Sequence, residues 1–440
     1  MQLLQDQIDT ILSYLKIKSL NEMQLATLKA NEVDNDIVLL SDTGSGKTLA
    51  FLLPILQLLN ETQKNSTQAL IIVPSRELAL QIDKVFKTMG TGFKITCCYG
   101  GHLRETEENN LIQAPTLIVG TPGRLGDHLR RGNIKPDTIQ TLVLDEFDKS
   151  FELGFQEEIR FVIESLKNVK KRILTSATDS NTIPDFIGLK NPTRINYLTG
   201  EPSEALAIQY LKSDINDKIE TLFRLICMLG NRSTIVFCNH RDAVERTSGL
   251  LSEKGLLNVF YHGAMEQQER DSALCKFRNG TVNILVTTDL ASRGLDIPNI
   301  RYIIHYHLPA NEETFTHRNG RTARMEASGT AIVIINPEEK LPAYIEKADA
   351  ITLPETAEIP EKPKWSTLFI AAGKKDKVNK IDIVGFLTNK GELKKEDIGL
   401  IEVKDFFSFV AVRKVKVSHT LQQIKNEKIK NKKVKIDIAK

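Results

Sequence analysis

The sequence predicts an α/β protein with two similar parallel-sheet domains in tandem and a small α+β domain after them. Short apolar runs alternate with helical patterns along most of its 440 residues. Strands that are buried on both faces of a parallel sheet produce such continuous apolar runs. Proline and glycine break the alternation near 191–204 and near 350–363. The expected parts are residues 1–200, residues 205–350, a linker at 351–365 and a third domain at 366–440.

Each parallel sheet should contain six strands joined by helices, because alternating strands and helices form right-handed βαβ crossovers. In the first domain the strands are expected at 37–40, 69–73, 95–99, 116–119, 141–144 and 172–175. In the second domain they are expected at 207–211, 234–237, 258–261, 283–286, 302–306 and 330–335. The third domain follows the order strand, helix, strand, strand, helix and strand, at 367–372, 381–387, 398–403, 407–412, 419–426 and 433–438.

The composition argues against a membrane protein, a secreted disulfide scaffold and a zinc-finger module. Hydrophobic residues make up 41% and charged residues 26%, as in ordinary folded chains. No apolar run approaches the roughly 18 residues that a membrane span needs. The five cysteines have no disulfide or metal-ligand spacing, and the first residues show no basic segment of a signal peptide. We therefore expect a cytoplasmic protein, and a monomer in the absence of any dimerising segment.

Charge is unevenly distributed along the chain, although the net charge is only +3. Residues 361–440 hold 20 Lys and Arg against 10 Asp and Glu, a net of +10, whereas residues 1–360 have a net of −7. A basic appendage suggests a polyanionic partner, most often nucleic acid. From charge alone, a lysine-rich solubilising tail explains the excess equally well.

The segment Ser41–Thr48, which reads SDTGSGKT, follows an expected strand and opens an expected helix. Glycines let backbone N–H groups wrap phosphates, and the helix N-terminus adds partial positive charge. Lys47 would reach the terminal phosphates, and the Thr48 hydroxyl would bind Mg²⁺. The usual pattern has glycine at its first position, where this chain has Ser41.

The strand at 141–144 is followed by three carboxylates at the edge where parallel sheets bind ligands: those of Asp145, Glu146 and, after Phe147, Asp148. Asp145 can hold Mg²⁺ through water, and Glu146 can orient and polarise an attacking water molecule. An acidic turn after a strand is common by itself, but its pairing with a phosphate loop about 100 residues upstream favours a nucleotide site.

Further short motifs follow in a fixed order, and together with the two above they resemble those of DEAD-box RNA helicases over roughly residues 1–345. They are Pro74–Ala79, Gly100–Gly101, Thr121–Arg124, Ser176–Thr178, His262–Met265, Thr287–Asp296 and His317–Arg324. The resemblance implies two tandem RecA-like domains that hydrolyse ATP with Mg²⁺ in an RNA-dependent manner. Two positions depart from the family: Phe147 replaces an alanine, and Ala323 replaces a glycine. We expect modest effects of both on rate.

The resemblance also implies roles for individual residues around the nucleotide. Gln24 occupies the position that reads the adenine edge, although the aromatic residue usual about 17 positions upstream is missing. Thr48 and Asp145 would hold Mg²⁺, and Lys47, Glu146, Arg321 and Arg324 would be catalytic. The two arginines belong to the second domain, so both domains are required for hydrolysis. The expected ATP-binding residues are Gln24, Thr43, Gly44, Ser45, Gly46, Lys47, Thr48 and Asp296.

Other residues are assigned to coupling and to RNA by the same resemblance. Ser176 and Thr178 would couple the nucleotide site to domain closure through Asp148. The RNA-contacting groups suit the sugar–phosphate backbone, which carries no base information. In the two larger domains these residues are Arg76, Gly101, Thr121, Arg124, Gly263, Gln267, Arg270 and Thr288.

The third domain has the element order of an RNA-recognition motif (RRM) and resembles the DbpA-type RNA-binding domain of DEAD-box proteins. Alternation along 407–412 places Phe407 and Phe409 on one face of a strand, with Val410 and Val412 on the other. Phe369 takes the matching place on the first strand, so these three aromatic residues would stack on RNA bases. A partner interface or ordinary surface packing is the rival interpretation of Phe407 and Phe409.

The expected function is that of an ATP-dependent RNA helicase that binds large-subunit ribosomal RNA and locally unwinds short duplexes, in ribosome biogenesis. Lysines near the end of the third domain would contact phosphates with strong salt dependence. These lysines are Lys428, Lys430, Lys432, Lys433 and Lys435. Two alternatives remain open, a general RNA helicase in messenger turnover and an ATP-controlled RNA clamp or chaperone that does not separate strands.

Overall fold

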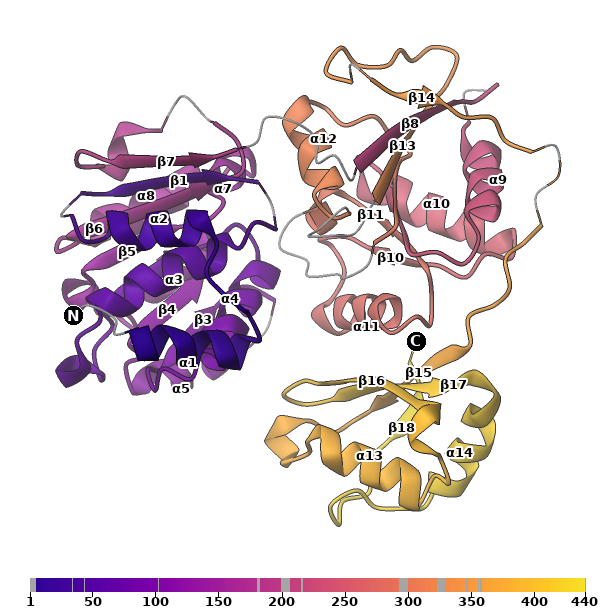
Figure 1. Cartoon of the computed structure of the whole chain (residues 1–440). Coiled ribbons are helices and arrows are strands. Elements are labelled where there is room, and N and C mark those ends of the chain that lie inside the picture. The colour runs from indigo at the N-terminus through magenta and orange to yellow at the C-terminus, as the bar shows by residue number, and fades with distance from the viewer. Residues whose placement is uncertain are drawn as a thin grey trace. The chain divides into compact units, whose positions relative to one another are not determined.

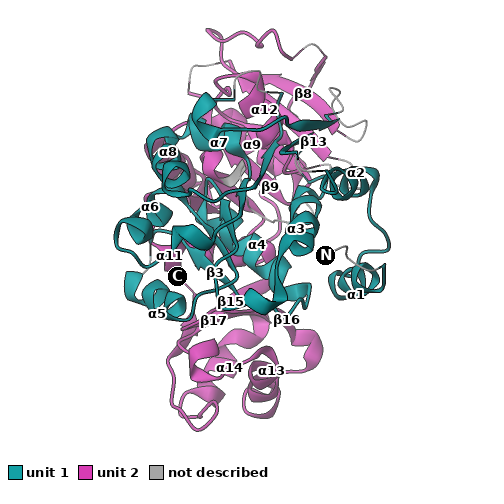
Figure 2. Cartoon of the chain, turned by 90° about the vertical axis from the view of Figure 1, so that its left-hand side faces the viewer, with its two compact units in different colours: residues 1–202, 293–296 teal, residues 203–292, 297–440 magenta. Residues whose placement is uncertain are grey.

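The structure is a computed structural model of the whole chain (Figure 1). It describes every residue except 1–4, 34, 43, 102, 180–182, 199–205, 215–216, 293–299, 323–328, 346, 355, 357 and 440. The described residues fall into two compact units, one up to Leu198 and the other from Leu206 onward (Figure 2). Among them, no helix is both long enough and apolar enough to cross a membrane.

The first unit is built on a parallel sheet of seven strands in the order β3-β4-β2-β5-β6-β1-β7. Successive residues of a strand point to opposite faces, so β1 supplies Ile37 and Leu39 to one core and Val38 and Leu40 to the other. Helices cover both faces, which is why these strands are apolar throughout. The strands are β1 Ile37–Ser41, β2 Ala69–Ile72, β3 Ile95–Cys98, β4 Leu117–Gly120, β5 Thr141–Leu144, β6 Lys171–Ser176 and β7 Thr193–Tyr197. The helices are α1 Gln5–Leu15, α2 Glu22–Ala30, α3 Lys47–Leu58, α4 Arg76–Thr88, α5 Arg104–Ile112, α6 Pro122–Arg130, α7 Phe147–Glu152 and α8 Gln156–Ser165.

The first six strands confirm the prediction to within a residue or two, but the seventh was missed. Residues 191–204 were expected to break the pattern, whereas β7 pairs in parallel with β1 at the edge of the sheet. In β7 only Ile195 is buried, so its sequence carries no continuous apolar run. An edge strand with one buried residue is indistinguishable from a linker by hydrophobicity alone.

The second unit begins with another seven-stranded parallel sheet, in the order β10-β11-β9-β12-β13-β8-β14. All six expected strands are present, and β14 adds an exposed two-residue edge that no apolar pattern marks. The strands are β8 Leu206–Lys212, β9 Thr234–Phe237, β10 Val259–Tyr261, β11 Ile284–Thr287, β12 Tyr302–His305, β13 Gly329–Ile335 and β14 Asp349–Ala350. The longer helices are α9 Ile219–Leu229, α10 Arg241–Glu253, α11 Gln267–Arg278 and α12 Glu312–Asn319.

The same unit ends in a four-stranded antiparallel sheet in the order β16-β17-β15-β18, with two helices on one face. The predicted order of strands and helices is confirmed. The elements are β15 Trp365–Ile370, α13 Lys380–Asn389, β16 Ile398–Val403, β17 Ser408–Arg413, α14 Val417–Ile424 and β18 Ile436–Ile438. Val410 and Val412 enter the core beneath the helices, and Phe407 and Phe409 lie on the opposite face, as the alternation predicted.

Candidate nucleotide and RNA-binding sites

The phosphate-loop candidate joins β1 to α3 and has a backbone that only glycine adopts comfortably. Gly44 and Gly46 have φ values of 84° and 93°. A Cβ atom on Gly46 would lie 2.6 Å from Nε2 of Gln24, which itself donates a hydrogen bond to the Gly46 carbonyl at 3.2 Å. The loop is therefore fixed both by its own conformation and by α2. Thr43, another predicted ATP ligand, lies outside the described residues.

The start of α2 holds this loop through two amide side chains. Asn21 and Gln24 form a capping box, in which each side chain accepts a hydrogen bond from the other's backbone N–H. Asn21 also donates from Nδ2 to the Ser45 carbonyl at 2.9 Å. Sequence reasoning missed Asn21, although the Asn-x-x-Gln spacing was a usable signal. The structure places Gln24 at the phosphate loop, and its adenine-reading role stays a prediction.

Lys47 lies at the first position of α3 with its amine buried among oxygen atoms. Its Nζ donates to the carbonyl of Ser41 and, at 3.0 Å, to that of Asp42. Burial lowers the pKa of Lys47, and the neighbouring carboxylates, Glu146 foremost, oppose that shift. The buried Ser45 hydroxyl finds no hydrogen-bond partner among the described residues. A buried cation and an unsatisfied hydroxyl on one loop suit an oxygen-rich ligand.

Asp145 and Glu146 follow β5 at the same edge of the sheet and share one threonine of β6. Thr175 donates its hydroxyl hydrogen to Oδ1 of Asp145 and accepts the Glu146 backbone N–H at 3.2 Å. Burial, followed by the negative charge of Glu146, raises the pKa of the Asp145 carboxyl. Glu146 has a φ of 49°, a left-handed conformation that is costly for a non-glycine residue. Sequence reasoning did not find Thr175.

These residues fit a magnesium nucleotide. A buried carboxylate with a second negative charge beside it favours a cation in contact with it. Thr48 and Asp145 would hold Mg²⁺. A bound Mg²⁺ ion would neutralise part of the negative charge of the phosphates. Phe147, at the position of the family's alanine, is 1% exposed and packs edge-to-face on Phe151 with ring centroids 6.0 Å apart. The larger ring is therefore accommodated in the core beside the two carboxylates.

The three predicted coupling residues are in direct contact. Thr178 donates from Oγ1 to Oδ2 of Asp148 at 3.0 Å. Ser176 accepts the Thr178 backbone N–H at 3.0 Å and donates to the Thr178 carbonyl at 2.7 Å. The carboxylate turn after β5 and the turn after β6 are thus tied together by hydroxyl groups.

In the second unit, Arg321 follows α12 and is 5% exposed, whereas Arg324 and Asp296 lie outside the described residues, as does Ala323. Arg318, one turn of chain earlier, is fully buried. It makes two bonds to the Asp289 carboxylate, at 2.5 and 3.1 Å, and donates to the His307 carbonyl and to Asn239 at 2.8 Å each. This arginine therefore ties three segments of the second unit together, a role typical of bidentate buried guanidinium groups.

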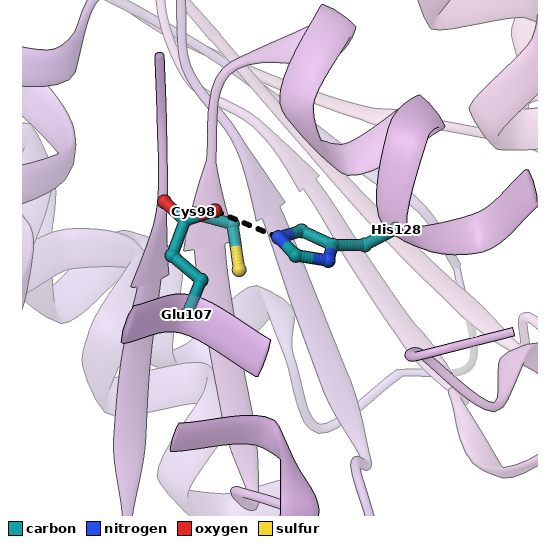
Figure 3. Close-up of side chains that lie close together, drawn as sticks. All are labelled: Cys98, Glu107 and His128. Atoms are coloured by element: carbon teal, nitrogen blue, oxygen red, sulfur yellow. Dashed lines mark hydrogen bonds and ion pairs between the residues drawn. The ribbon is translucent and has the colours of Figure 1, made fainter. Parts of the chain in front are cut away.

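The RNA candidates of the first unit lie around one buried carboxylate that sequence reasoning missed. Glu107 of α5 accepts the Tyr99 backbone N–H at 2.7 Å, contacts Nε2 of His128 at 2.7 Å and forms an ion pair with Arg124 at 3.3 Å. Figure 3 shows Glu107 and His128 meeting beside the Cys98 thiol. Burial raises the pKa of that thiol, which is therefore neutral. The network joins Arg124 to the strand that leads into Gly101.

The other two candidates of this group are close to that network. A Cβ atom on Gly101 would lie 2.3 Å from the Arg76 guanidinium, so Arg76 covers this glycine directly. Thr121 directly precedes α6 and donates its backbone N–H to the Cys98 carbonyl at 2.9 Å. The structure thus brings together all four predicted RNA residues of the first unit.

In the second unit, Gly263 and Thr288 line a groove of about 550 Å³ with Asn239, His240, Arg241, Asp242, His262 and Ala264. Gln267 begins α11 nearby in sequence. Arg270 differs from the expectation of an RNA contact, because it is 2% exposed and donates to the Tyr261 hydroxyl at 2.6 Å. Helix packing turns this guanidinium inward, which its place in the motif did not reveal.

The three aromatic residues of the third domain form one cluster, with ring centroids 5.4 to 5.8 Å apart. Their surroundings differ from the expectation of an open base-stacking face, because Phe409 is 1% exposed and packs on Cys275 of α11. The structure therefore agrees with the rival interpretation, in which this face packs against another part of a protein.

A separate basic area, here called the lysine surface, lies on the same domain. Lys430 donates to the Lys377 carbonyl at 2.6 Å and pairs with Asp382, and Lys432 pairs with Asp376. These contacts bring the end of the chain beside the N-terminus of α13. The surface comprises the exposed residues Lys374, Lys375, Lys377, Lys380, Lys430, Lys432 and Lys433. Two of these lysines are paired with carboxylates, those of Asp382 and Asp376, and the lysines outnumber these carboxylates.

Comparisons with known proteins agree with this geometry. The DEAD/DEAH box helicase model matches residues 21–186, the helicase conserved C-terminal domain model 217–326 and the DbpA RNA binding domain model 367–438. The chain is 34% identical to the ATP-dependent RNA helicase DbpA of Escherichia coli (strain K12), over 98% of this chain and 97% of that protein. It is 31% identical to DbpA of Bacillus subtilis (strain 168), over 95% and 94%.

Among solved structures, Dbp5 of S. cerevisiae bound to RNA and ADP BeF3 matches with a TM-score of 0.70 and 27% identity, over 79% of this chain and 94% of that one. The matched family models and the two relatives of nearly equal length cover both parallel-sheet domains and the third domain. The chain therefore belongs to the DEAD-box family of ATP-dependent RNA helicases, in the group that carries a DbpA-type RNA-binding domain.

Proposed function

We propose that this helicase binds ribosomal RNA through its third domain and locally opens short duplexes nearby, during assembly of the large ribosomal subunit. The observation that carries the proposal is that one chain combines a phosphate loop beside paired carboxylates with a third domain that has an exposed lysine surface. Similarity along almost the whole length of two DbpA helicases supports the same assignment.

The nucleotide chemistry follows from the residues around α3. Lys47 and the first backbone N–H groups of α3 bind and orient the phosphates of ATP. Glu146, fixed in direction by its left-handed backbone, orients the attacking water and accepts its proton. Thr175 holds the carboxylate pair in place. Arg321 and Arg324 supply further positive charge to the transferred phosphoryl group, as the family motif predicts.

The first-unit RNA residues bind the sugar–phosphate backbone and leave the bases unread. Arg76 and Arg124 provide charge, and Gly101 allows close approach of the RNA to the backbone. Gly263 and Thr288 would act in the same way from their groove. The preference for one RNA over another then depends on the third domain. Its lysine surface binds RNA phosphates, so the affinity for RNA falls steeply as the salt concentration rises.

The test compares ATP hydrolysis by the full chain with total ribosomal RNA and with poly(A), followed by unwinding of a short duplex. We expect stimulation by ribosomal RNA at concentrations where poly(A) fails, and no activity in Lys47→Ala. A Lys375→Glu/Lys380→Glu variant should lose the preference. The same charge change beyond the other end of α13, Lys390→Glu/Lys394→Glu, should keep it.

Two results would redirect the proposal. Equal stimulation by both RNAs would favour a general RNA helicase in messenger turnover. ATPase activity that ribosomal RNA stimulates, without any strand separation, would favour an ATP-controlled clamp or chaperone. If both lysine variants lost the preference for ribosomal RNA equally, the lysine surface would not be the site that recognises this RNA.

A further inference from the structure

A thiol, a carboxylate and an imidazole meet in the interior of the first unit, at Cys98, Glu107 and His128 (Figure 3). One ligand atom from each residue lies within 4.8 Å of the ligand atoms of the other two. The three residues are 0%, 1% and 0% exposed, so their polar atoms face one another and not bulk water. Sulfur, carboxylate oxygen and imidazole nitrogen are the ligand atoms of zinc sites in proteins.

The distances within this cluster suit a tetrahedral ion. Bonds of about 2.0–2.3 Å to Zn²⁺ place neighbouring ligand atoms roughly 3.3–3.6 Å apart. Nε2 of His128 and Oε2 of Glu107 are 2.7 Å apart, so an ion between them would widen this pair by less than about 1 Å. The Cys98 sulfur lies within 4.8 Å of both residues' ligand atoms and completes the third corner. Adjustments of this size need only small side-chain rotations.

Each ligand comes from a different element, and the secondary structure turns each one inward. Cys98 is the last residue of β3 and belongs to the core on one face of the sheet. Glu107 lies four residues before Leu111 on the buried face of α5. His128 lies three residues after Leu125 on the buried face of α6. Ligands on packed helices and strands are held more precisely than ligands on loops.

Neighbouring polar groups orient two of the three ligands. The Tyr99 N–H donates to Oε1 of Glu107 at 2.7 Å, and the other oxygen, Oε2, contacts His128. On the far side of the imidazole, Nδ1 lies 3.1 Å from the side-chain amide of Asn133. An amide offers either hydrogens or an oxygen, so a half-turn lets Asn133 accept a proton on Nδ1 when Nε2 binds an ion. Such outer partners set the direction of metal ligands.

We propose that Cys98, Glu107 and His128 bind one Zn²⁺ ion. The Cys98 thiol releases its proton to solvent and binds as a thiolate. His128 binds through Nε2, with its ring proton moved to Nδ1, and Glu107 binds through Oε2, while water takes the fourth position. Two negative ligands balance the charge of the ion. Mg²⁺ prefers oxygen ligands, so the cation of the nucleotide site does not compete here.

Arg124 connects this site to the surface that is predicted to bind RNA. Its side chain is 15% exposed, and its guanidinium lies 3.3 Å from Oε2 of Glu107, the oxygen that the ion would take. A guanidinium and a divalent ion repel each other at such distances, so the ion displaces Arg124 from its carboxylate. Zinc would therefore release Arg124 from its fixed position and weaken the grip on RNA.

Titration of the full chain with Co²⁺, in excess Mg²⁺ and a phosphine reductant, tests the site. Co²⁺ takes the place of Zn²⁺ in such sites, and a cobalt–thiolate bond gives a charge-transfer absorption band. We expect one equivalent of Co²⁺ to produce the band and one equivalent of Zn²⁺ to remove it. Cys98→Ala should lose the band. Asn133→Ala should keep the band and bind Co²⁺ about 10–100-fold more weakly, because it removes only an outer partner.

The neighbouring cysteine supplies the matched control. Cys97 packs in the core on the other face of the sheet, so Cys97→Ala removes a thiol one residue away and should leave the band unchanged. Melting temperatures without added metal show whether each variant folds. If Cys98→Ala does not fold, His128→Gln replaces it and should bind Co²⁺ roughly hundredfold more weakly or not at all. A wild-type chain without the band, or a band that survives Cys98→Ala, would overturn the proposal.

A second arm measures ATPase activity against ribosomal RNA concentration, and this arm alone rests on the proposed function. One equivalent of Zn²⁺ should raise the RNA concentration for half-maximal stimulation roughly fivefold or more in the wild type and leave Cys98→Ala unchanged. An equal effect in both proteins, or none in the wild type, would overturn the link to Arg124. If ribosomal RNA gives no stimulation, the proposed function fails, and the Co²⁺ titration still decides the metal site.

Discussion

Replacement of Glu107 by glutamine should loosen the RNA grip of the first unit while sparing its nucleotide site. The carboxylate is 1% exposed and serves the Tyr99 N–H, His128 and Arg124 at once. A glutamine keeps the shape but loses the charge and one acceptor oxygen. Hydrogen bonds to a charged group contribute about 1.5–3 kcal/mol each, so we expect the free energy of unfolding to fall by about 2–3 kcal/mol.

Two assays check this expectation. Urea denaturation of the full chain reports the loss of stability. RNA-dependent ATPase reports function, and the RNA concentration for half-maximal stimulation should rise roughly fivefold or more, because Arg124 loses its fixed position. The KM for ATP should stay within about twofold, since none of the contacts given for Glu107 reaches the described residues of the phosphate loop.

Glu108 provides the matched control one residue away. It is 37% exposed and pairs with Arg104 at 3.1 Å, an interaction of the exposed kind that contributes about 0.3–0.5 kcal/mol. Glu108→Gln should therefore change stability and RNA dependence little. Equal losses in the two variants, or a Glu107→Gln protein as stable as wild type, would refute the reasoning from burial.

Three further outcomes follow from other sites. Gly46→Ala should abolish ATP hydrolysis, because of its positive φ and the 2.6 Å approach of the Gln24 amide, whereas Gly249→Ala on an open helix face should be harmless in the same ATPase assay. Thr175→Val should lower kcat roughly tenfold or more in ATPase measurements with a small change in melting temperature, because Asp145 loses its hydroxyl donor. Burial, helped by Arg318, lowers the pKa of His305 from 6.5 to about 3, so the unfolded chain binds a proton that the folded chain excludes. Stability should therefore fall as pH drops below about 6.5, by roughly 2 kcal/mol at pH 5, in urea titrations, and His305→Gln should flatten that slope.

Much of the fold could be predicted from the sequence, because parallel strands buried on both faces are continuous runs of apolar residues. All twelve expected strands of the two larger sheets exist, and so does every element of the third domain. Alternation also separated Phe409 from Val410 correctly. The edge strands β7 and β14 could not be predicted from the sequence. The first has one buried residue and the second has none, so neither contains a run of apolar residues. The phosphate loop was equally readable, since its glycines have a conformational reason that acts locally.

The residues that sequence reasoning missed or placed differently depend on neighbours far away in the chain. Thr175 is recognised only beside Asp145, thirty residues earlier. Glu107 looks like one more acidic residue of an exposed helix until Arg124 and His128 reach it. Phe409 was correctly placed on its face, but a strand cannot reveal that a helix more than a hundred residues upstream covers it.

The two residues that cap α2 also hold the phosphate loop in place. The amide oxygen of Gln24 accepts a hydrogen bond from the Asn21 N–H, and its amide nitrogen donates one hydrogen bond to the Gly46 carbonyl. An amide has a second hydrogen and a second lone pair, enough for the donor and acceptor of an adenine edge. If the predicted adenine-reading role of Gln24 holds, one side chain caps a helix and also reads the base. Any substitution of Gln24 made to test nucleotide selectivity should therefore also disturb the cap of α2 and its contact with the phosphate loop.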